Sequence, residues 1–217
     1  MAVRVYAADT GCLSDPVLFD RLYETVSRNR KAKIEMLCSK DAKLRSLGVG
    51  ILLKRALAEK GINEADAVFC LDEYKKPYIE DHPEIFFNLS HSGDYSVCAV
   101  ADTPVGCDIE KIRKVNLKLA DKFFADDENG YIKGMFSQAE RTKAFFEIWT
   151  LKESFVKAVG KGLKIPLSGF SVLSGEAVYG KDKYCLVTLP IDPGYKSACC
   201  FRGEKEEIET ERVDLSE

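Results

Sequence analysis

The segment Val105-Gly106-Cys107-Asp108-Ile109-Glu110 alternates apolar and polar side chains, a pattern typical of a short β-strand with one buried face. Because alternate residues of a strand share a face, its three apolar side chains are expected to point into the core. Asp108 and Glu110 would then lie together on the other face, where Gly106 leaves room beside them. Two carboxylates on one face can bind a hard cation such as Mg²⁺. The alternative is the solvated polar face of an edge strand.

The chain on the two sides of residue 105 shows two comparable sets of helices and strands. Before it, we expect strands at 3–8, 67–71, 85–89 and 95–101 and helices at 15–37 and 39–60. After the 105–110 strand we expect helical segments over 116–136, a long helix from 137 to about 160, strands near 169–173, 184–189 and 197–201, and a solvated tail from about 203. Ser137 and Glu140 match a capping box at the start of the long helix. The pattern predicts an α+β protein with two halves, 1–104 and 105–217, and a ligand cleft between them.

The composition argues against several other classes of protein. The 217 residues are 46% hydrophobic and 31% charged, which is ordinary for a globular protein. A net charge of −3 provides no general attraction for nucleic acid, and no apolar run is long enough to cross a membrane. The eight cysteines include no CxxC pair, which argues against a zinc site. Since no signal peptide precedes them, we expect buried free thiols in a cytoplasmic protein.

A second candidate site lies on the long helix, in the stretch WTLKESFVK at 149–157. Residues four apart stack on one face of a helix, so Trp149, Glu153 and Lys157 are expected to line up. A packed tryptophan beside an ordinary surface Glu–Lys pair is the alternative. The helix is apolar on much of its surface, which indicates that little of it faces water.

Candidate phosphate-binding groups occur in the first half. The stretch NLSHSG at 88–93 is expected to be a loop whose hydroxyls and imidazole offer donors to a phosphate, although serine and glycine also favour plain turns. Basic residues crowd the end of the 15–37 helix and the loop at 75–77, either as a phosphate-binding surface or as a solvated charged face. Together with the carboxylates, these features favour metal-assisted transfer of a phosphoryl-type group.

Four ordered motifs resemble those of Sfp-type 4′-phosphopantetheinyl transferases. They are KPY at 76–78, NLSHSG at 88–93, GCDIE at 106–110 and WTLKESFVK at 149–157, and the resemblance extends from about Arg30 to Phe170. It implies an α+β fold of two similar halves in a pseudo-twofold arrangement, with coenzyme A bound between them. The implied reaction is the Mg²⁺-dependent transfer of the 4′-phosphopantetheine group of coenzyme A to a serine of an apo acyl or peptidyl carrier protein, releasing 3′,5′-ADP.

The resemblance implies that the second half holds the metal site and the catalytic helix. Asp108, Glu110 and Glu153 would be the Mg²⁺ ligands. Glu153 would also be the general base for the carrier serine, and Asp108 and Lys157 would act with it in catalysis, with Lys157 on the phosphate. Glu128 matches a family glutamate to which we assign no role.

The resemblance assigns binding of the coenzyme A phosphates and adenine to the first half. Lys76 would lie beside the adenine. The expected binding residues are Arg30, Lys33, Arg45, Ser46, Lys76, Ser90 and His91, together with Lys157 of the second half. Cys107 stands where the family usually has a branched apolar residue, and it should pack there as a small hydrophobe.

The resemblance implies a carrier protein that is acidic around its modified serine, so its partner should offer basic and apolar groups, as the segment after Glu110 does. Lys118 and Lys122 would form a basic stripe beside Leu119 and Phe123, although an ordinary amphipathic helix shows the same pattern. The carboxylates would equally suit a Mg²⁺-dependent hydrolase of nucleotides or pyrophosphates, and a non-enzymatic module that binds carrier proteins is a third reading. Fatty-acid, polyketide and nonribosomal-peptide carriers all remain open. The two-half layout makes an oligomer unnecessary, so we expect a monomer.

Overall fold

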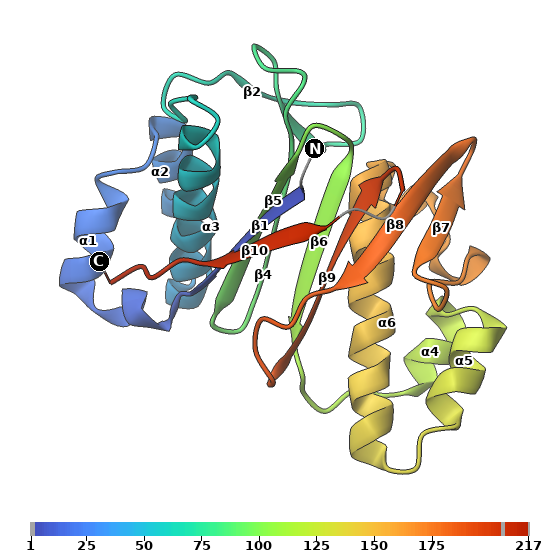
Figure 1. Cartoon of the computed structure of the whole chain (residues 1–217). Helices are drawn as coiled ribbons and strands as arrows, with labels where there is room; N and C mark the ends of the chain where they lie inside the picture. Colours follow the sequence, from blue (N-terminus) through green and yellow to red (C-terminus); the bar gives the residue numbers. More distant parts are fainter. Residues whose placement is uncertain (1–2, 205–206, 217) are drawn as a thin grey trace.

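The computed structural model describes residues 3–204 and 207–216 and has the α+β architecture predicted from the sequence. In this part of the chain the strands form two four-stranded sheets and one short two-stranded sheet. Figure 1 shows the two large sheets side by side in the middle of the molecule, with a long helix on the outer side of each.

The first half contains one of the large sheets. It begins with β1 (Val3–Asp9), followed by a short 3₁₀ turn, α1 (Pro16–Tyr23), α2 (Arg28–Glu35) and the long helix α3 (Lys40–Ala58). The short strands β2 (Phe69–Leu71) and β3 (Pro77–Ile79) pair with each other. The antiparallel hairpin of β4 (Phe86–Ser92) and β5 (Tyr95–Ala101) completes this half, with β5 lying between β1 and β4.

The second half repeats this plan. It begins with β6 (Val105–Lys111), followed by α4 (Lys118–Phe123), α5 (Asp126–Lys133) and the long helix α6 (Gln138–Val159). Two 3₁₀ turns lead to β7 (Glu176–Tyr179), β8 (Asp182–Thr188) and β9 (Tyr195–Arg202). The sheet order β6-β9-β8 corresponds to β1-β5-β4 of the first half, with α6 in the place of α3. The expectation of two similar α+β halves is therefore confirmed.

Buried side chains form three layers, and the one between the two sheets holds the halves together. The facing surfaces of the two sheets share a core that includes Val5, Val97, Cys107 and Ile109. The outer face of the first sheet packs under α3, and the outer face of the second sheet packs under α6. As predicted, the apolar residues of β6 point between the sheets, which leaves its polar residues on the side of α6. Five of the eight cysteines are buried, and no disulfide joins any two of them within the described ranges.

Strands β4 and β6 belong to different sheets, and side chains bridge them where the two halves meet. The Cys107 amide donates to Asn88 Oδ1 at 2.9 Å, and the Cys107 thiol donates to the Asn88 carbonyl at 3.3 Å. Four residues further along both strands, the Lys111 amide donates to Ser92 Oγ at 3.1 Å. Since β6 carries both candidate carboxylates, this seam fixes them against β4.

Three local expectations are wrong. The helical pattern at 15–37 is broken between α1 and α2, where buried Glu64 accepts hydrogen bonds from Ser27, the N-cap of α2. The stretch 88–93 is not a loop, because β4 runs to Ser92 and only then turns. Residues 169–173 do not form a strand; a 3₁₀ turn at Leu167–Gly169 leads into irregular chain instead.

The expected solvated tail also contains a strand. β10 (Ile208–Arg212) returns to the first half and pairs in parallel with β1, Val3 lying opposite Ile208. Ion pairs of Arg4 with Glu209 at 2.7 Å and of Arg55 with Glu211 at 2.6 Å accompany this pairing. The first sheet is thus completed by residues from beyond position 105, and the functional division into 1–104 and 105–217 stays a prediction.

Candidate active site

Helix α6 lies unusually close to β6 because Gly106 has no side chain. A Cβ built on Gly106 would lie 2.1 Å from the Ser154 carbonyl oxygen and 2.4 Å from the Ala158 amide nitrogen, so no other residue fits there. The helix begins at the predicted capping box of Ser137 and Glu140. This close approach brings the helix side chains onto the polar face of β6.

Asp108 is the most buried carboxylate of the site, with 5% of its surface exposed. Its Oδ1 accepts hydrogen bonds from Lys157 Nζ at 2.6 Å and from Ser90 Oγ at 2.8 Å. Its Oδ2 is buried and has no hydrogen-bond partner among the described residues. A buried carboxylate oxygen without a donor is costly, so this atom is suited to a further cationic ligand.

Glu110 and Glu153 complete a cluster of negative charge around Asp108. The pKa of Glu110 is raised, because the side chain is partly buried and Asp108 repels its charge, although a hydrogen bond from Ser92 Oγ at 2.8 Å opposes this rise. The pKa of Glu153 is raised for the same two reasons, burial first and the charge of Asp108 second. The two glutamates are therefore electrostatically strained in the absence of a cation.

Lys157 supplies the nearer of two positive charges that the described residues place at this cluster, since Arg113 lies 3.9 Å from Glu110 and Lys157 lies 2.6 Å from Asp108. Besides Asp108, its ammonium donates to Ser90 Oγ at 3.1 Å and to the Cys107 carbonyl at 3.2 Å. Burial alone would lower the pKa of Lys157, but the interactions with Asp108, Cys107 and Glu153 together outweigh it and the pKa is raised. The predicted alignment of Glu153 with Lys157 on α6 thus places both beside β6, whereas Trp149 packs against Phe145 and Phe123.

The donor set fits a hard cation, although the side chains are not arranged as a finished site. Within residues 3–204 and 207–216, no group of three or more His, Cys, Asp or Glu side chains is arranged to hold a metal ion. The carboxylate oxygens of Asp108, Glu110 and Glu153 are nevertheless of the kind that Mg²⁺ prefers, and the buried Asp108 Oδ2 accepts no hydrogen bond from the described residues. In this arrangement Lys157 occupies Oδ1 as the counter-charge.

Two candidate cations of the first half border a cavity between α2, β2 and β4. The cavity has a volume of about 350 Å³ and is lined by Arg30, Lys33, Phe69, Phe87 and Leu89, among others. Burial lowers the pKa of Arg30, and burial together with the charge of Arg30 lowers the pKa of Lys33. No ion pair of either side chain is recorded in the described part of the chain. A bound anion would stabilise the charged forms of both side chains.

The remaining candidates of the first half lie nearer to β6. Arg45 donates to the Gly93 carbonyl at 3.4 Å, and its charge is the second cause, after burial, of the lowered pKa of His91. Ser46 is the next residue of α3 and is buried. Ser90 contacts both Asp108 and Lys157, so the structure joins it to the carboxylate site.

A second cavity of about 300 Å³ connects the halves beside α6, and Lys76 lies at its edge. It is lined by Tyr74, Lys76, Asn88, Glu153, Lys157 and Leu167, among others. The Lys76 ammonium, however, donates to three backbone carbonyls of the second half. Its expected place beside an adenine stays a prediction.

Sequence reasoning missed two contributors to this site. Ser92 donates to Glu110, and Asn88 binds the backbone of Cys107 beside Asp108. Both lie on the same face of β4 as Ser90, since alternate residues of a strand share a face. Reading 88–92 as a strand would have found them.

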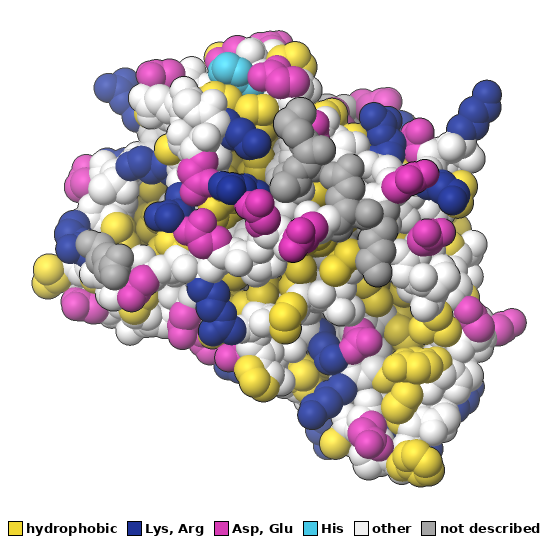
Figure 2. All heavy atoms as spheres, viewed as in Figure 1, with side chains coloured by type: hydrophobic (Ala, Val, Ile, Leu, Met, Phe, Trp, Pro, Cys, Tyr) yellow, Lys and Arg dark blue, Asp and Glu magenta, His cyan; other side chains and the backbone are white. Residues whose placement is uncertain are grey.

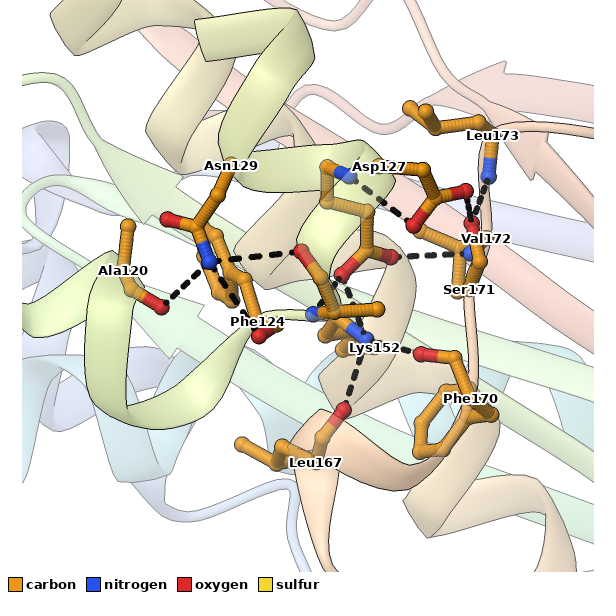
Figure 3. A network of polar contacts seen from close by, with 12 residues as sticks. Ala120, Phe124, Asp127, Asn129, Lys152, Leu167, Phe170, Ser171, Val172 and Leu173 are labelled. Carbon is orange, nitrogen blue, oxygen red and sulfur yellow. Dashed lines mark hydrogen bonds and ion pairs between the residues drawn. The ribbon is translucent and has the colours of Figure 1, made fainter. Parts of the chain in front are cut away.

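Glu128 has a structural place away from the carboxylate cluster. Its carboxylate contacts α5, α6 and the chain after Leu167, within the network of polar contacts around Lys152 and Val172 that Figure 3 shows. It pairs with Lys152 Nζ at 2.8 Å, both side chains being fully buried, and accepts from the amides of Ala125 and Val172. Lys152 also donates to the Leu167 and Phe170 carbonyls. The Lys152–Glu128 pair thus anchors α5 and the 167–172 segment to α6, the helix that carries Glu153.

The segment after Glu110 has the exposed basic and apolar side chains that the sequence indicated. Lys114, Lys118 and Lys122 are exposed, and Leu119 is 40% exposed. Phe123 packs against Trp149, so the apolar side of α4 is partly used in the core.

Comparisons with known proteins show the family of the chain. A family model described as the 4′-phosphopantetheinyl transferase superfamily matches residues 104–184, which include β6 and α6. The 4′-phosphopantetheinyl transferase ffp of Bacillus subtilis is 35% identical over 189 residues, covering 83% of this chain and 84% of that protein. Sfp of Bacillus subtilis (strain 168) is 33% identical over 189 residues with the same coverage. The corresponding enzyme gsp of Aneurinibacillus migulanus is 34% identical over 193 residues, covering 86% of this chain and 80% of that protein.

The chain therefore belongs to the 4′-phosphopantetheinyl transferase superfamily, as the motifs implied. Within it, the similarity to ffp, Sfp and gsp makes the chain an Sfp-like phosphopantetheinyl transferase, an enzyme. Enzymes of this family use coenzyme A as substrate and act on carrier proteins. A weaker structural likeness, with a TM-score of 0.35 and 17% identity, relates 48% of this chain to 64% of the holo-acyl-carrier-protein synthase of Thermotoga maritima.

Two surface observations bear on partners. No helix in the described ranges is long and apolar enough to span a membrane. On the face seen in Figure 2, basic and acidic side chains are interspersed and neither sign forms a continuous field. This face therefore agrees with the small net charge of the whole chain.

Proposed function

We propose that this enzyme transfers the 4′-phosphopantetheine group of coenzyme A to a serine of an apo acyl or peptidyl carrier protein, with Mg²⁺, and releases 3′,5′-ADP. The observation that carries the proposal is the meeting of Asp108, Glu153 and Lys157 at the seam between the halves. A buried carboxylate oxygen without a donor and two glutamates with raised pKa values describe a site that gains from a divalent cation.

Coenzyme A would lie across the seam. Its 3′-phosphate would be held by Arg30 and Lys33, whose cavity offers positive charge beside aromatic and aliphatic walls. The pyrophosphate would lie nearer β6, within reach of Arg45, His91 and Ser90, with Ser46 behind them on α3. In this arrangement residues 1–104 bind the nucleotide part, and residues 105–217 supply the metal site and the catalytic helix.

The chemistry that Mg²⁺ would supply, bound by Asp108, Glu110 and Glu153, is to neutralise charge on the phosphate oxygens. Glu153 would take the proton of the carrier serine, a role favoured by its raised pKa. The serine oxygen then bonds to the pantetheine-side phosphorus, and the bond from that phosphorus to the bridging oxygen breaks. Lys157 would donate a hydrogen bond to the departing 3′,5′-ADP, since its pKa keeps it charged.

Mass spectrometry of apo carrier proteins incubated with coenzyme A tests the reaction. The expected result is a phosphopantetheine mass increase on the carrier serine that requires Mg²⁺ and falls at least about 100-fold in Asp108→Asn. Asp102→Asn, an exposed aspartate in the turn before β6, is the matched control and should be unaffected. Release of 3′,5′-ADP without modified carrier would instead indicate a hydrolase, and an unchanged Asp108→Asn rate would remove Asp108 from the metal site.

The carrier would dock over α4, beside the site. Exposed Lys118 and Lys122 offer an acidic partner positive charge, and Leu119 offers it an apolar contact. Reversing both lysines to glutamate should lower kcat/KM for the carrier and flatten its salt dependence, with coenzyme A affinity unchanged. The same reversal at Lys181 and Lys183, on the β7–β8 hairpin, is the control. Equal effects of the two double variants would move the docking surface elsewhere.

A further inference from the structure

The Lys76 ammonium is bound entirely to main-chain oxygens of the other half. It donates to the Lys157 carbonyl at 2.6 Å, to the Ala158 carbonyl at 3.0 Å and to the Val105 carbonyl at 3.2 Å. Two of these oxygens belong to the last turn of α6, and the third belongs to the first residue of β6. One side chain of the first half thus joins the two elements that carry the catalytic groups.

The last turn of α6 needs such a donor. Carbonyls in the last turn of a helix have no partner within the helix, and the helix dipole places partial negative charge there. The Gly160 amide donates to Val156, which leaves the next two carbonyls of the turn for Lys76. A cation at this end stabilises the turn, and this turn contains Lys157.

The surroundings of Lys76 are shaped to hold it in place. The Asp72 carboxylate accepts from the amides of Tyr74 and Lys76, which closes a tight turn before β3. Gly160 ends α6 with a φ of 78°, and a Cβ there would lie 3.0 Å from Lys76 Cδ. The stem of the lysine therefore runs along a glycine that any side chain would obstruct. Lys76 is partly buried, and this burial lowers the pKa of its ammonium to about 8.

We propose that Lys76 is a positioning residue for the catalytic lysine: its ammonium fixes the main chain of Lys157 against the start of β6, so that the Lys157 side chain meets Asp108. The proposal rests on the role of Lys157 in the proposed function. A displacement of about 1 Å in a catalytic group can cost about 100-fold in rate. Loss of the Lys76 ammonium should therefore act on kcat although Lys76 itself does not touch the reacting atoms.

The test is steady-state kinetics of Lys76→Met with coenzyme A, Mg²⁺ and an apo carrier protein that the wild type modifies. We expect kcat to fall at least 10-fold in a protein that is folded by circular dichroism, with the KM for coenzyme A changed less than threefold. Lys76→Arg and Lys76→Gln retain side-chain donors and should recover part of kcat. They also provide the measurement if the methionine variant does not fold.

Lys161→Met is the matched control. Lys161 also links the end of α6 to the 72–76 turn, lying 4.1 Å from the centre of the Tyr74 ring and 3.8 Å from Glu73, but it reaches neither Lys157 nor β6. Its kcat should stay within twofold of the wild type. A loss in Lys161→Met equal to that in Lys76→Met would mean that the whole junction matters and would overturn the specific role of Lys76.

Lys157→Ala, measured in parallel, separates the catalytic role of Lys157 from the positioning role of Lys76. If Lys157→Ala keeps the wild-type kcat, the catalytic role of Lys157 fails. If Lys157→Ala loses activity while Lys76→Met keeps the wild-type kcat, or raises only the KM for coenzyme A, the positioning role fails and Lys76 is a ligand-binding residue.

Discussion

The first strands of the two halves, β1 and β6, differ on the face that meets the long helix. Both place small apolar residues between the sheets, such as Val5 in β1 and Cys107 in β6. Toward the helix, β1 presents Tyr6, whose hydroxyl donates to Glu59 at 2.7 Å at the end of α3, and the buried Ala8. The corresponding face of β6 presents Gly106, Asp108 and Glu110.

This difference shows how one architecture yields an apolar core under one long helix and a cluster of buried charge under the other. The helix-facing side of β1 is filled, so α3 packs on it as a conventional core. The side chain missing at Gly106 lets α6 approach until Lys157 reaches Asp108. The second half therefore buries charged side chains where the first half buries apolar ones. A buried charge is costly unless an opposite charge and hydrogen bonds compensate it.

The largest effect on stability is expected from removing the Lys152 ammonium, which compensates the buried charge of Glu128 in the second half. Lys152→Met would leave Glu128 buried without its cation, and we expect a loss of about 3–5 kcal/mol in the free energy of unfolding, measured with urea. Lys133→Met, which breaks the exposed pair with Asp121, is the control and should cost less than about 1 kcal/mol. Similar losses in the two variants would mean that the buried pair is not a special support of α6.

Giving β6 a side chain where α6 makes its closest approach should have the next largest effect. Gly106→Ala places a methyl group against helix backbone, so that α6 must shift as a whole to make room, and we expect about 3 kcal/mol of destabilisation. Transfer activity should fall about 100-fold, since α6 must move away from Asp108. Gly130→Ala, in α5 with open space around its Cβ position, should be neutral or slightly stabilising. A fully active Gly106→Ala enzyme would contradict the close-approach argument.

The electrostatic strain of the site should be visible as a pH dependence of stability. The folded-state pKa values of Glu110 and Glu153 lie above the ordinary value of 4.5, so the folded protein takes up protons before the unfolded chain as the pH falls toward 4.5. Without divalent cations, the wild type should therefore gain stability over this range relative to Glu110→Gln/Glu153→Gln.

Mg²⁺ at pH 7 provides the complementary measurement. It should raise the Tm of the wild type by a few degrees and leave that of the double variant unchanged, because a ligand stabilises only the protein that binds it. In the pH experiment, parallel profiles of stability against pH for the wild type and the double variant would show that these glutamates are not strained.

The smallest effect concerns the turn that connects the halves through Lys76. Lys75 has a φ of 66°, in the left-handed region that favours glycine, and it is the one such residue other than glycine in the described ranges. Lys75→Gly should therefore stabilise the protein by about 0.5–1 kcal/mol in urea unfolding. Lys75→Ala keeps the unfavourable conformation and should show no gain. Equal stability of both variants would indicate that the turn relaxes without cost.

Patterns within a single element gave correct predictions for this site. Alternation predicted which residues of β6 face the helix, and the four-residue spacing placed Glu153 and Lys157 on one side of α6. The motif at 88–92 was misread because polar residues on a strand suggested a loop, whereas here they face the seam. No pattern could predict the partners of Lys76, since they are main-chain oxygens brought close only by the packing of the two halves.

The parallel pairing of β10 with β1 has a consequence for biosynthesis. On the ribosome, β1 is made more than a hundred residues before its neighbour on that edge, and until then its amides and carbonyls on that side have no strand to pair with. Pairings between segments so distant in sequence form slowly. A nascent chain that has completed α3 and even α6 therefore still exposes an open sheet edge. We expect chaperone dependence and aggregation during synthesis to be greatest before residues 208–212 emerge.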